Sequence, residues 1–309
     1  MKYAVTGGAG FIGSHLIRTL LNQGHTVTAI DNLNTGRMDN IKPVLDKIDF
    51  VKGDIRDFEL LKSKFKDVDG VFHEAALASV QESFSKEKEY HEVNVEGTEN
   101  ILRLAKEFEF KIVYASSSSV YGNPVRIPIV EGDPKNPINP YAQTKLDDER
   151  IATKYANEGV HVIGLRYFNV FGERQSQAYA GVIKKFLKKA NNGEAPIING
   201  DGSQTRDFVY VDDVVQANIL AMKSHVNHEF FNVGTGTTIS VLELANLIID
   251  AFGLSLKPFH GPELPGDVKI TKADISLAKK LLGWQPKVDI KEWLKAVITA
   301  RTNLDLITD

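Results

Sequence analysis

A tyrosine and a lysine are spaced for proton transfer in the segment PINPYAQTKLDDER, at residues 137–150. Tyr141 lies four residues before Lys145, so on a helix both side chains share one face about one turn apart. A cation held beside a tyrosine favours the phenolate, which can serve as a general base. Coincidence on an amphipathic helix is the alternative, but none of the other eight tyrosines has a lysine four residues later. Tyr141 is therefore the candidate base.

A run of serines ends a short apolar stretch in ASSSSVYG, at residues 115–122. The run is either a polar turn at a strand end or part of a reaction site. Its own tyrosine, Tyr121, is followed four residues later by Val125, so it has no lysine to tune it. The spacing therefore separates Tyr121 from the role of base and leaves the serines as candidates for a reacting hydroxyl.

The glycine-rich segment TGGAGFIG, at residues 6–13, stands between an apolar run and a helical pattern. Gly7, Gly10 and Gly13 permit a tight turn and let a diphosphate approach a helix N-terminus, where unpaired N–H groups favour anions. A plain glycine-rich turn is the alternative, which the strand–turn–helix context disfavours. Asp31 closes the second apolar run, 18 residues after Gly13, where a carboxylate can accept ribose hydroxyls. Because a 2′-phosphate would meet a like charge there, the sequence favours NAD over NADP.

Six short apolar runs alternate with helical patterns through the first half of the chain. This alternation predicts an α/β fold with a doubly wound parallel sheet. A helix is expected from Ser14 to Gln23, ended by Gly24, with an apolar face that covers the sheet. The predicted strands are YAVT (3–6), TVTAID (26–31), DFVKGD (49–54), GVFHEAA (70–76), KIVYASS (111–117) and VHVIGLR (160–166).

The second half of the chain loses this rhythm, which predicts a smaller lid domain. The segments 196–213 and 257–274 are rich in turn residues, and loops of that length are usually functional. We expect a dinucleotide-binding domain at 1–168 plus about 204–234, in which the strand and helix of 206–222 and the strand near 229–233 return to the main sheet. The substrate domain would comprise about 169–203 and 235–309.

The composition favours neither nucleic acid nor membrane as a partner. The 309 residues carry a formal net charge of -3, and no stretch approaches the roughly 18 to 20 apolar residues of a membrane span. The absence of cysteine excludes disulfides and thiolate chemistry, and the eight histidines show no HExxH pattern, so no metal site is predicted. Because Met1 leads directly into a strand-like run without a signal-peptide pattern, we expect a cytoplasmic location.

Taken together, the motifs resemble the extended short-chain dehydrogenase/reductase family. Within it, the chain is similar to NAD-dependent nucleotide-sugar epimerases of the UDP-glucose 4-epimerase type. The similarity implies a Rossmann domain with a smaller α/β lid, bound NAD, and C4 epimerisation of a UDP-hexose through a 4-keto intermediate. It also implies a homodimer paired through the helices expected at 90–109 and 141–157. The motifs that carry it are Thr6-Gly7-x-x-Gly10-x-x-Gly13, Asp31, Asp54, the serine run through Val120-Tyr121-Gly122, Tyr141-x-x-x-Lys145, VNVEGT (93–98), LRYFNVFG (165–172), RDFVYVDD (206–213) and PGDVKITKAD (265–274).

The resemblance assigns roles to individual residues. Tyr141 would be the base, with Lys145 as its tuner and a ligand of the nicotinamide ribose. Ser117 would bind the reacting hydroxyl, Asn94 would brace the active-site helix, and Tyr121 would be a wall of the sugar pocket. The implied NAD-binding residues are Gly7, Gly10, Phe11, Ile12, Gly13, Asp31, Asn32, Asn34, Gly36, Asp54, Ile55, Ala75, Ala76, Ser116, Tyr141, Lys145 and Tyr167. The implied substrate-binding residues are Ser79, Ser117, Ser118, Tyr141, Asn169, Val182, Phe186, Ile198, Asn199, Arg206 and Asp267; for Val182 and Phe186, core packing is an equally good interpretation.

Two positions depart from what the resemblance implies for the substrate. Leu264 stands where such epimerases commonly carry an arginine of the diphosphate clamp, so Arg174, Lys184 or Lys269 would have to replace that contact. Thr271 stands where many strict glucose/galactose epimerases have a bulky aromatic residue. A small residue there would leave room for a 2-acetamido group, so UDP-N-acetylglucosamine is a further candidate substrate.

Other activities of the same family remain alternatives. A 4,6-dehydratase usually has Asp-Glu within the serine/threonine run, whereas this chain has Ser118-Ser119 there, which counts against elimination. A uronate epimerase or a decarboxylase would share the same motifs. A non-catalytic nucleotide-binding protein is a rival of another class, against which the joint presence of Ser117, Tyr141 and Lys145 argues.

Overall fold

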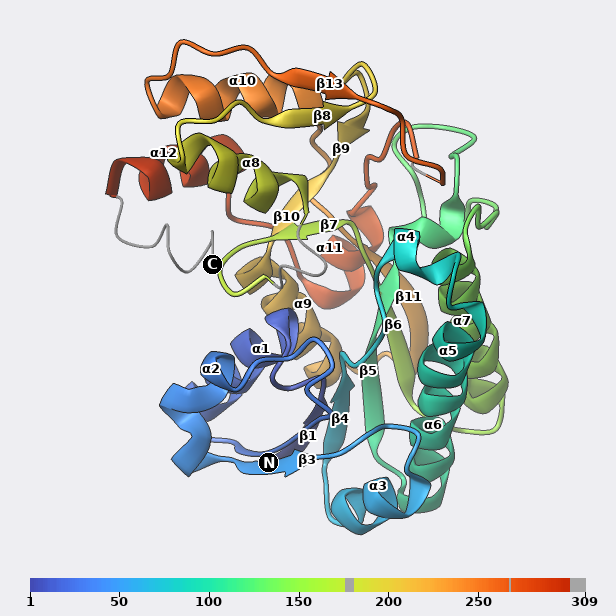
Figure 1. Cartoon of the computed structure of the whole chain (residues 1–309). Coiled ribbons are helices and arrows are strands. Elements are labelled where there is room, and N and C mark those ends of the chain that lie inside the picture. Colours follow the sequence, from blue (N-terminus) through green and yellow to red (C-terminus); the bar gives the residue numbers. More distant parts are fainter. Residues whose placement is uncertain (176–180, 267, 301–309) are drawn as a thin grey trace.

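A seven-stranded parallel sheet forms the centre of the computed structural model, which describes residues 1–175, 181–266 and 268–300. Its strand order is β11-β6-β5-β4-β1-β2-β3, so the order reverses direction between β1 and β4 (Figure 1). The predicted doubly wound sheet is thereby confirmed, with the six strands predicted in the first half of the chain in it. The strands are β1 (Lys2–Thr6), β2 (Thr26–Asp31), β3 (Asp49–Lys52), β4 (Gly70–His73), β5 (Lys111–Ser117), β6 (Val162–Tyr167) and β11 (His228–Val233).

Helices cover both faces of this sheet because its strands are apolar on both sides. On one face, α1 and α9 pack together and share a core with β1 and β6; on the other, α3, α6 and α7 share a second core with β4 and β5. Helix α1 begins at Phe11, three residues before the predicted start, because Gly10 already takes the N-cap position. The covering helices are α1 (Phe11–Asn22), α2 (Met38–Ile41), α3 (Phe58–Phe65), α6 (Gly97–Phe108), α7 (Pro140–Asn157), α9 (Val211–Lys223) and α11 (Ser276–Leu282).

Shorter elements complete this part of the chain. The helix predicted at 90–109 is divided: α5 (Glu87–Tyr90) passes through a π-helical turn, His91–Glu96, into α6. The remaining pieces are the 3-10 turns Lys42–Lys47 and Ser118–Tyr121 and the short helix α4 (Val80–Ser83). Such π-turns are often found at functional sites, and this one carries Asn94.

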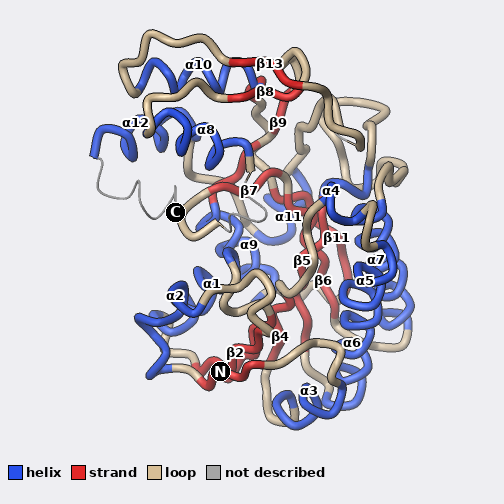
Figure 2. The backbone as a smooth tube through the Cα atoms, viewed as in Figure 1, coloured by secondary structure: helices blue, strands red, loops and turns tan. Residues whose placement is uncertain are grey.

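A second lobe with its own apolar core lies beyond the carboxyl ends of the sheet strands (Figure 2). Among the described residues, it contains three helices and pairs of very short strands instead of one continuous sheet. The expectation that the strand near residue 208 returns to the main sheet is wrong, because β10 pairs in parallel with β7; the following α9 does pack on the main sheet, and β11 joins it. The elements are β7 (Asn169–Phe171) with β10 (Phe208–Tyr210), β9 (Thr205–Arg206) with β12 (Ile239–Ser240), β8 (Ile197–Asn199) with β13 (Phe259–Gly261), and the helices α8 (Val182–Asn191), α10 (Val241–Ala251) and α12 (Ile290–Ala300).

Asp207, which is 0% exposed, ties together the segments that connect the two lobes. Its carboxylate accepts hydrogen bonds from the backbone N–H groups of Thr235 (2.7 Å), Gly236 (2.9 Å) and Ala273 (2.9 Å). Its carbonyl oxygen accepts the N–H of Asn169 at 3.0 Å. One carboxylate therefore satisfies the backbone of several crossings between the lobes.

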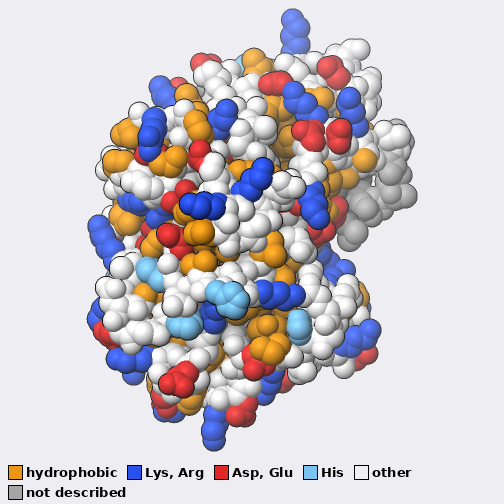
Figure 3. All heavy atoms as spheres, turned by 180° about the vertical axis from the view of Figure 1, so that it is seen from behind, with side chains coloured by type: hydrophobic (Ala, Val, Ile, Leu, Met, Phe, Trp, Pro, Cys, Tyr) orange, Lys and Arg blue, Asp and Glu red, His pale blue; other side chains and the backbone are white. Residues whose placement is uncertain are grey.

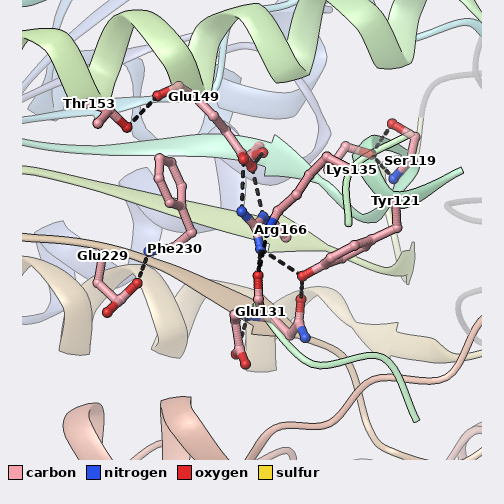
Figure 4. Close-up of polar contacts among 12 residues, drawn as sticks. Ser119, Tyr121, Glu131, Lys135, Glu149, Thr153, Arg166, Glu229 and Phe230 are labelled. Atoms are coloured by element: carbon pink, nitrogen blue, oxygen red, sulfur yellow. Dashed lines mark hydrogen bonds and ion pairs between the residues drawn. The ribbon is translucent and has the colours of Figure 1, made fainter. Parts of the chain in front are cut away.

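Arg166, on β6, is the centre of a buried polar network that fixes α7 against the sheet (Figure 4). It makes a bidentate ion pair with Glu149 of α7, through Nε and Nη2 at 2.8 Å each. The hydroxyl of Ser116, on β5, donates to the same carboxylate at 2.7 Å. Both members of the pair are at most 4% exposed. Burial opposes the charge of Arg166, but the bond to Glu149 outweighs it, so the pKa of Arg166 is raised.

Tyr121 belongs to this network and not to a ligand pocket. It is 1% exposed, its hydroxyl accepts from Arg166 Nη1 at 2.7 Å, and it donates to Asn232 Oδ1 at 2.7 Å. Burial raises the pKa of Tyr121, which keeps the hydroxyl protonated. The interpretation of Tyr121 as a wall of the sugar pocket is therefore wrong, because Arg166 on β6 binds its hydroxyl.

The surface, the helices and the acidic and histidine side chains give three further observations. On the described part of the rear face, side chains of both charge signs are interspersed (Figure 3). Within residues 1–175, 181–266 and 268–300, no helix is long and apolar enough to cross a bilayer. The same residues contain no group of three or more histidine, aspartate or glutamate side chains that could hold a metal ion.

We predict that Arg166→Met lowers the free energy of unfolding by about 3 kcal/mol or more, because it leaves the Glu149 carboxylate buried without its partner. Urea unfolding followed by circular dichroism measures this. The matched control is Arg150→Gln, which breaks an exposed ion pair with Asp147 on the same helix and should cost less than about 1 kcal/mol. Equal losses in the two variants would contradict the structural role assigned to Arg166.

Candidate active site

The turn between β1 and α1 forms a narrow backbone cradle. Gly7 has φ +67°, and a Cβ on it would lie 2.8 Å from the N atom of Ala75. A Cβ on Gly13 would lie 2.2 Å from the carbonyl oxygen of Gly7. Only glycine fits these positions, and the result is an open N-terminus of α1 whose N–H groups can donate hydrogen bonds to an anion.

Asp31 is held at the carboxyl end of β2, beside the cradle. Its carboxylate accepts the backbone N–H groups of Ala9 at 3.0 Å and Leu33 at 2.8 Å. Burial raises the pKa of Asp31, and these N–H groups oppose the shift. Gly36 contributes by leaving space, because a Cβ there would lie 2.6 Å from Asp31 Oδ1.

A second carboxylate, Asp54, lies near Asp31 in the same cavity wall. Its hydrogen bond to the Arg56 side chain, supported by Asn32 Nδ2 at 2.9 Å, lowers the pKa of Asp54 to about 2. Asp54 is therefore ionised over the whole neutral range, and Arg56, which also lines the cavity, pairs with it at 2.8 Å.

A single cavity of about 740 Å³ runs from this cradle, past the ends of β4 and β5, to the second lobe. Most of the site residues named from the sequence line it. They are Gly7, Gly10, Phe11, Ile12, Gly13, Asp31, Asn32, Asn34, Asp54, Ile55, Ala75, Ala76, Ser79, Ser116, Ser117, Tyr141, Lys145, Tyr167, Asn169, Val182, Phe186, Asn199 and Arg206.

Four named residues do not line this cavity, and Asp267 lies outside the described residues. Gly36 acts from behind Asp31, and Asn94 is fully buried behind the wall. Ile198 was expected to contact the substrate, but it is 0% exposed in the core of the second lobe, since β8 turns that side chain inward. Ser118 begins a 3-10 turn after β5 and falls outside the lining for that reason.

Tyr141 and Lys145 both face the cavity from the first two turns of α7. The helix starts sharply because Asn139 caps it, accepting the N–H of Ala142 at 2.8 Å, and Pro140 follows at the first helical position. The predicted spacing on one helical face is thus present in the structure.

Asn94 connects the start of α7 to the loop after β4. Its Oδ1 accepts the N–H of Leu77 at 2.8 Å, and its Nδ2 donates to Leu77 O and to Thr144 Oγ1, at 3.0 Å each. Thr144 stands directly before Lys145 on the helix. The π-turn therefore holds the cavity wall and the helix at a fixed separation.

Lys145 is almost completely buried and carries an ion pair that the sequence analysis did not anticipate. Its Nζ lies 3.1 Å from Asp148 Oδ2, on the same helix. Burial opposes the charge of Lys145, but Asp148, Tyr141 and Glu74 together raise its pKa. Lys145 therefore stays a cation throughout the neutral range.

Glu74, at the end of β4, is a second carboxyl that the sequence analysis missed. It lines the cavity, accepts the Tyr167 hydroxyl at 2.9 Å, and has a buried Oε2 without a hydrogen-bond partner among the described residues. Burial raises the pKa of Glu74 to about 7. No motif marks this residue; the only sequence signal is a charge placed directly after an apolar strand.

The serine run divides into separate roles. Ser117 lines the cavity at the end of β5, and its Oγ accepts the N–H of Ser119 at 3.1 Å and the Ser119 hydroxyl at 2.9 Å. Its own proton is thus available to a ligand. Ser116 instead donates to Glu149, so its hydroxyl is committed to the network around Arg166.

On the side of the second lobe, polar side chains from three elements approach the cavity. Asn169 donates to Asp207 O at 3.2 Å, and Arg206 donates to Thr205 O at 2.9 Å. Leu264 lines the cavity, as does the cation of Lys185, which the sequence analysis did not name. Elsewhere along the cavity, the lining residues that it missed include Thr35, Arg56, Leu77, Ala78, Val80, Gln81, Glu89, Gln175 and Gln204.

Thr271 is placed differently from the interpretation made from the sequence. It is 8% exposed, it is absent from the described lining of the cavity, and its Oγ1 accepts the N–H of Asp207 at 3.2 Å. The size of this side chain therefore does not by itself set the room for a sugar substituent.

Comparisons with known proteins place the chain in a family. Residues 3–234 match the model of the NAD dependent epimerase/dehydratase family. The chain belongs to this family. A putative UDP-glucose 4-epimerase of Methanocaldococcus jannaschii is 42% identical over 304 residues, which span 97% of this chain and 98% of that protein.

Solved structures of family members resemble the chain over almost its whole length. The UDP-glucose 4-epimerase of Thermotoga maritima, with UDP-glucose, has a TM-score of 0.93 and 36% identity, covering 98% of this chain and 100% of that chain. The UDP-N-acetylglucosamine 4-epimerase of Methanobrevibacter ruminantium, in complex with UDP-N-acetylmuramic acid, has a TM-score of 0.91 and 37% identity, covering 96% of this chain and 97% of that one.

The residues of the cradle fit the dinucleotide that the family uses. The positions where a Cβ would collide keep the backbone open for a diphosphate at the start of α1. Asp31 presents an oriented carboxylate where an adenosine ribose would place its hydroxyls. Gly7, Gly10 and Gly13 would hold the diphosphate, and Tyr141 and Lys145 would lie at the nicotinamide end of the cavity.

Proposed function

We propose that this protein is an NAD-dependent UDP-hexose 4-epimerase, interconverting UDP-glucose and UDP-galactose or their N-acetyl forms. One observation carries the proposal: a single cavity joins the dinucleotide cradle, the Tyr141–Lys145 pair and the polar residues of the second lobe. A dinucleotide and a nucleotide sugar can therefore meet at Tyr141. The names of the family members described above support the same reaction class.

In the proposed reaction, Tyr141 takes the proton of the sugar 4-hydroxyl while the Ser117 hydroxyl aligns that oxygen. Bound NAD supplies the hydride chemistry at C4 in both directions. Lys145 keeps a positive charge beside Tyr141, which stabilises the negative charge that develops there. The ring of the 4-keto sugar then turns its other face to the cofactor. Tyr141 returns the proton to the oxygen on C4, and the product is the C4 epimer.

The second lobe would hold the nucleotide diphosphate. Asn169 and Arg206 present N–H donors to the cavity wall, and Lys185 adds a cation. Val182 and Asn199 would lie beside the uracil and its ribose. Leu264 occupies the expected arginine position, and the three residues expected from the sequence to replace it, Arg174, Lys184 and Lys269, are absent from the described lining. Lys185 is a cation in the lining that would replace this contact.

Elimination of water is disfavoured at the serine run. A 4,6-dehydratase needs an acid and a base beside C5 and C6, whereas this chain has Ser118 and Ser119 there, and the Ser119 hydroxyl donates to Ser117. We therefore place the dehydratase second, and treat it as an outcome of the assay.

The central experiment incubates the purified protein with UDP-glucose, UDP-galactose, UDP-N-acetylglucosamine and UDP-N-acetylgalactosamine in separate reactions. We expect interconversion within at least one pair, measured by chromatography of the sugars at equilibrium. Mass spectrometry of the denatured protein should identify NAD as a copurifying nucleotide. A 6-deoxy-4-keto product, or four unchanged sugars, would refute the epimerase proposal.

We predict that Tyr141→Phe lowers kcat by roughly 10²-fold or more, since it removes the positioned acid-base group. The amount of bound NAD should stay unchanged. Tyr155→Phe is the matched control, because Tyr155 lies on the same helix but its hydroxyl contacts Glu99 at 3.3 Å, away from the cavity. Near-normal turnover in Tyr141→Phe would show that another group is the base.

We also propose a cytoplasmic homodimer. The two helical segments expected to pair, now α5 to α6 and α7, lie side by side on one face of the sheet and could form a four-helix contact with a second copy. Light scattering should then give twice the chain mass of 34.2 kDa. A mass equal to one chain at micromolar concentration would contradict the dimer.

A further inference from the structure

The Lys145–Asp148 ion pair is enclosed by the protein. The side chain of Lys145 is 4% exposed and that of Asp148 is 0% exposed, and their charged atoms are 3.1 Å apart. They occupy positions i and i+3 of α7, so they share one helical face with Tyr141. Among residues on this face, Tyr141 and Lys145 reach the cavity, whereas Asp148 lies behind them.

Asp148 is poorly satisfied for a buried carboxylate. One oxygen receives the ammonium of Lys145, while Oδ1 is buried and has no hydrogen-bond partner among the described residues. Isolated buried charges are costly, and an unpaired acceptor adds to that cost. If position 148 had a purely structural role, an apolar side chain would stabilise the helix better there. The carboxylate at 148 therefore indicates an electrostatic effect on Lys145.

We propose that Asp148 is a positioning residue that sets how strongly the Lys145 ammonium acts on Tyr141. The inference rests on the proposed function, in which Tyr141 moves the proton of the sugar. When Asp148 is ionised, it holds the ammonium and offsets its charge. When Asp148 is neutral, the full charge of Lys145 acts on Tyr141 and on the adjacent cavity.

The charged and titratable groups around the pair leave Asp148 as the main modulator. On α7 itself, Asp147 and Glu149 flank Asp148, but Asp147 pairs with Arg150, and Glu149 pairs with Arg166. Around Lys145, the groups from other elements are Glu74 and His73 at β4; Tyr114 of β5 faces Asp148. Among these groups, Asp148 makes the direct contact with the ammonium.

Two of the three neighbours of the pair, His73 and Tyr114, keep one protonation state near neutral pH, and Glu74 does not. Burial, with the charge of Lys145 adding to it, lowers the pKa of His73 to about 3, so that ring is neutral. Burial, with Glu149 and Asp148 nearby, raises the pKa of Tyr114, so that phenol is protonated. Glu74 titrates near neutral pH as Asp148 does, and its charge also acts on Lys145. Its hydrogen bond goes to Tyr167, however, and among the described residues the ion pair of Lys145 is with Asp148.

The protonation state of Asp148 changes within the working range of an enzyme. Burial raises the pKa of Asp148 to about 7, against the opposing effect of Lys145. Below that pH the carboxyl is neutral and the pair carries a net positive charge; above it the pair is neutral. Replacing Asp148 with a neutral amide should therefore favour negative charge on Tyr141 chiefly above about pH 7.

The test is Asp148→Asn, in which the amide oxygen can still accept the Lys145 ammonium. Tyrosinate absorbance is titrated in the protein with its bound nucleotide, with and without the added change Tyr141→Phe, so that the difference reports Tyr141 alone. We expect the midpoint of this difference to fall by roughly 0.5 to 1 pH unit relative to the parent protein. The acid limb of the kcat/KM profile should move in the same direction.

Asp147→Asn is the control, because it removes the same charge from the same helix at a position that pairs with Arg150 at the surface. Its midpoint should match that of the parent. If Asp148→Asn does not fold, as judged by its thermal melt, Asp148→Ser serves as the neutral variant with the same expectation.

An unchanged or raised midpoint in a folded neutral variant would overturn the inference. The spectroscopic titration needs no sugar substrate, so it separates the two proposals. A lowered midpoint without sugar interconversion would refute the epimerase proposal but support the electrostatic role of Asp148.

Discussion

Buried charge on one face of α7 constrains the whole catalytic half of the molecule. Lys145, Asp148 and Glu149 are each at most 4% exposed, and a charge at such a depth is costly unless another charge meets it. Glu149 finds Arg166 on β6, and Lys145 finds Asp148 within the helix. The Glu149–Arg166 pair requires one position and one rotation of α7 against the sheet. It therefore also fixes the direction in which Tyr141 projects.

The dinucleotide side of the cavity depends on steric fit instead of charge. The loop after β4 lies so close to the β1–α1 turn that Gly7 has no room for a side chain beside Ala75. These two strands are neighbours at the point where the strand order reverses, which is where open α/β sheets leave a crevice. The cradle and the Tyr141 helix therefore open into one space because both follow strands that end at the same edge.

Features that depend on spacing within one element could be predicted from the sequence. The Tyr141–Lys145 pair, the glycine turn and the six strands of the first half are of this kind, because helix and strand periodicity alone places their residues. Features set by contacts between distant segments could not. Tyr121 is hydrogen-bonded to Arg166, and Thr271 is hydrogen-bonded to the backbone of Asp207. Strand β10 pairs with β7. Each of these contacts joins residues that are more than 35 positions apart in the sequence. Glu74 and Asp148 carry no motif, and only their burial distinguishes them from ordinary surface acids.

The connections between the lobes, held together by Asp207, bear on how stereochemistry can invert. The chain passes between the lobes several times, and the carboxylate at 207 binds backbone from two of these passages while its own backbone binds a third. Two lobes that are connected by several hydrogen-bonded segments have no single hinge for an opening motion. Under the proposed function, the oxidised sugar would have to reverse its face inside a chamber of nearly constant shape, tethered by its diphosphate. The protein would then keep its conformation during the reaction, and rotation of the 4-keto sugar within the cavity would invert the configuration at C4.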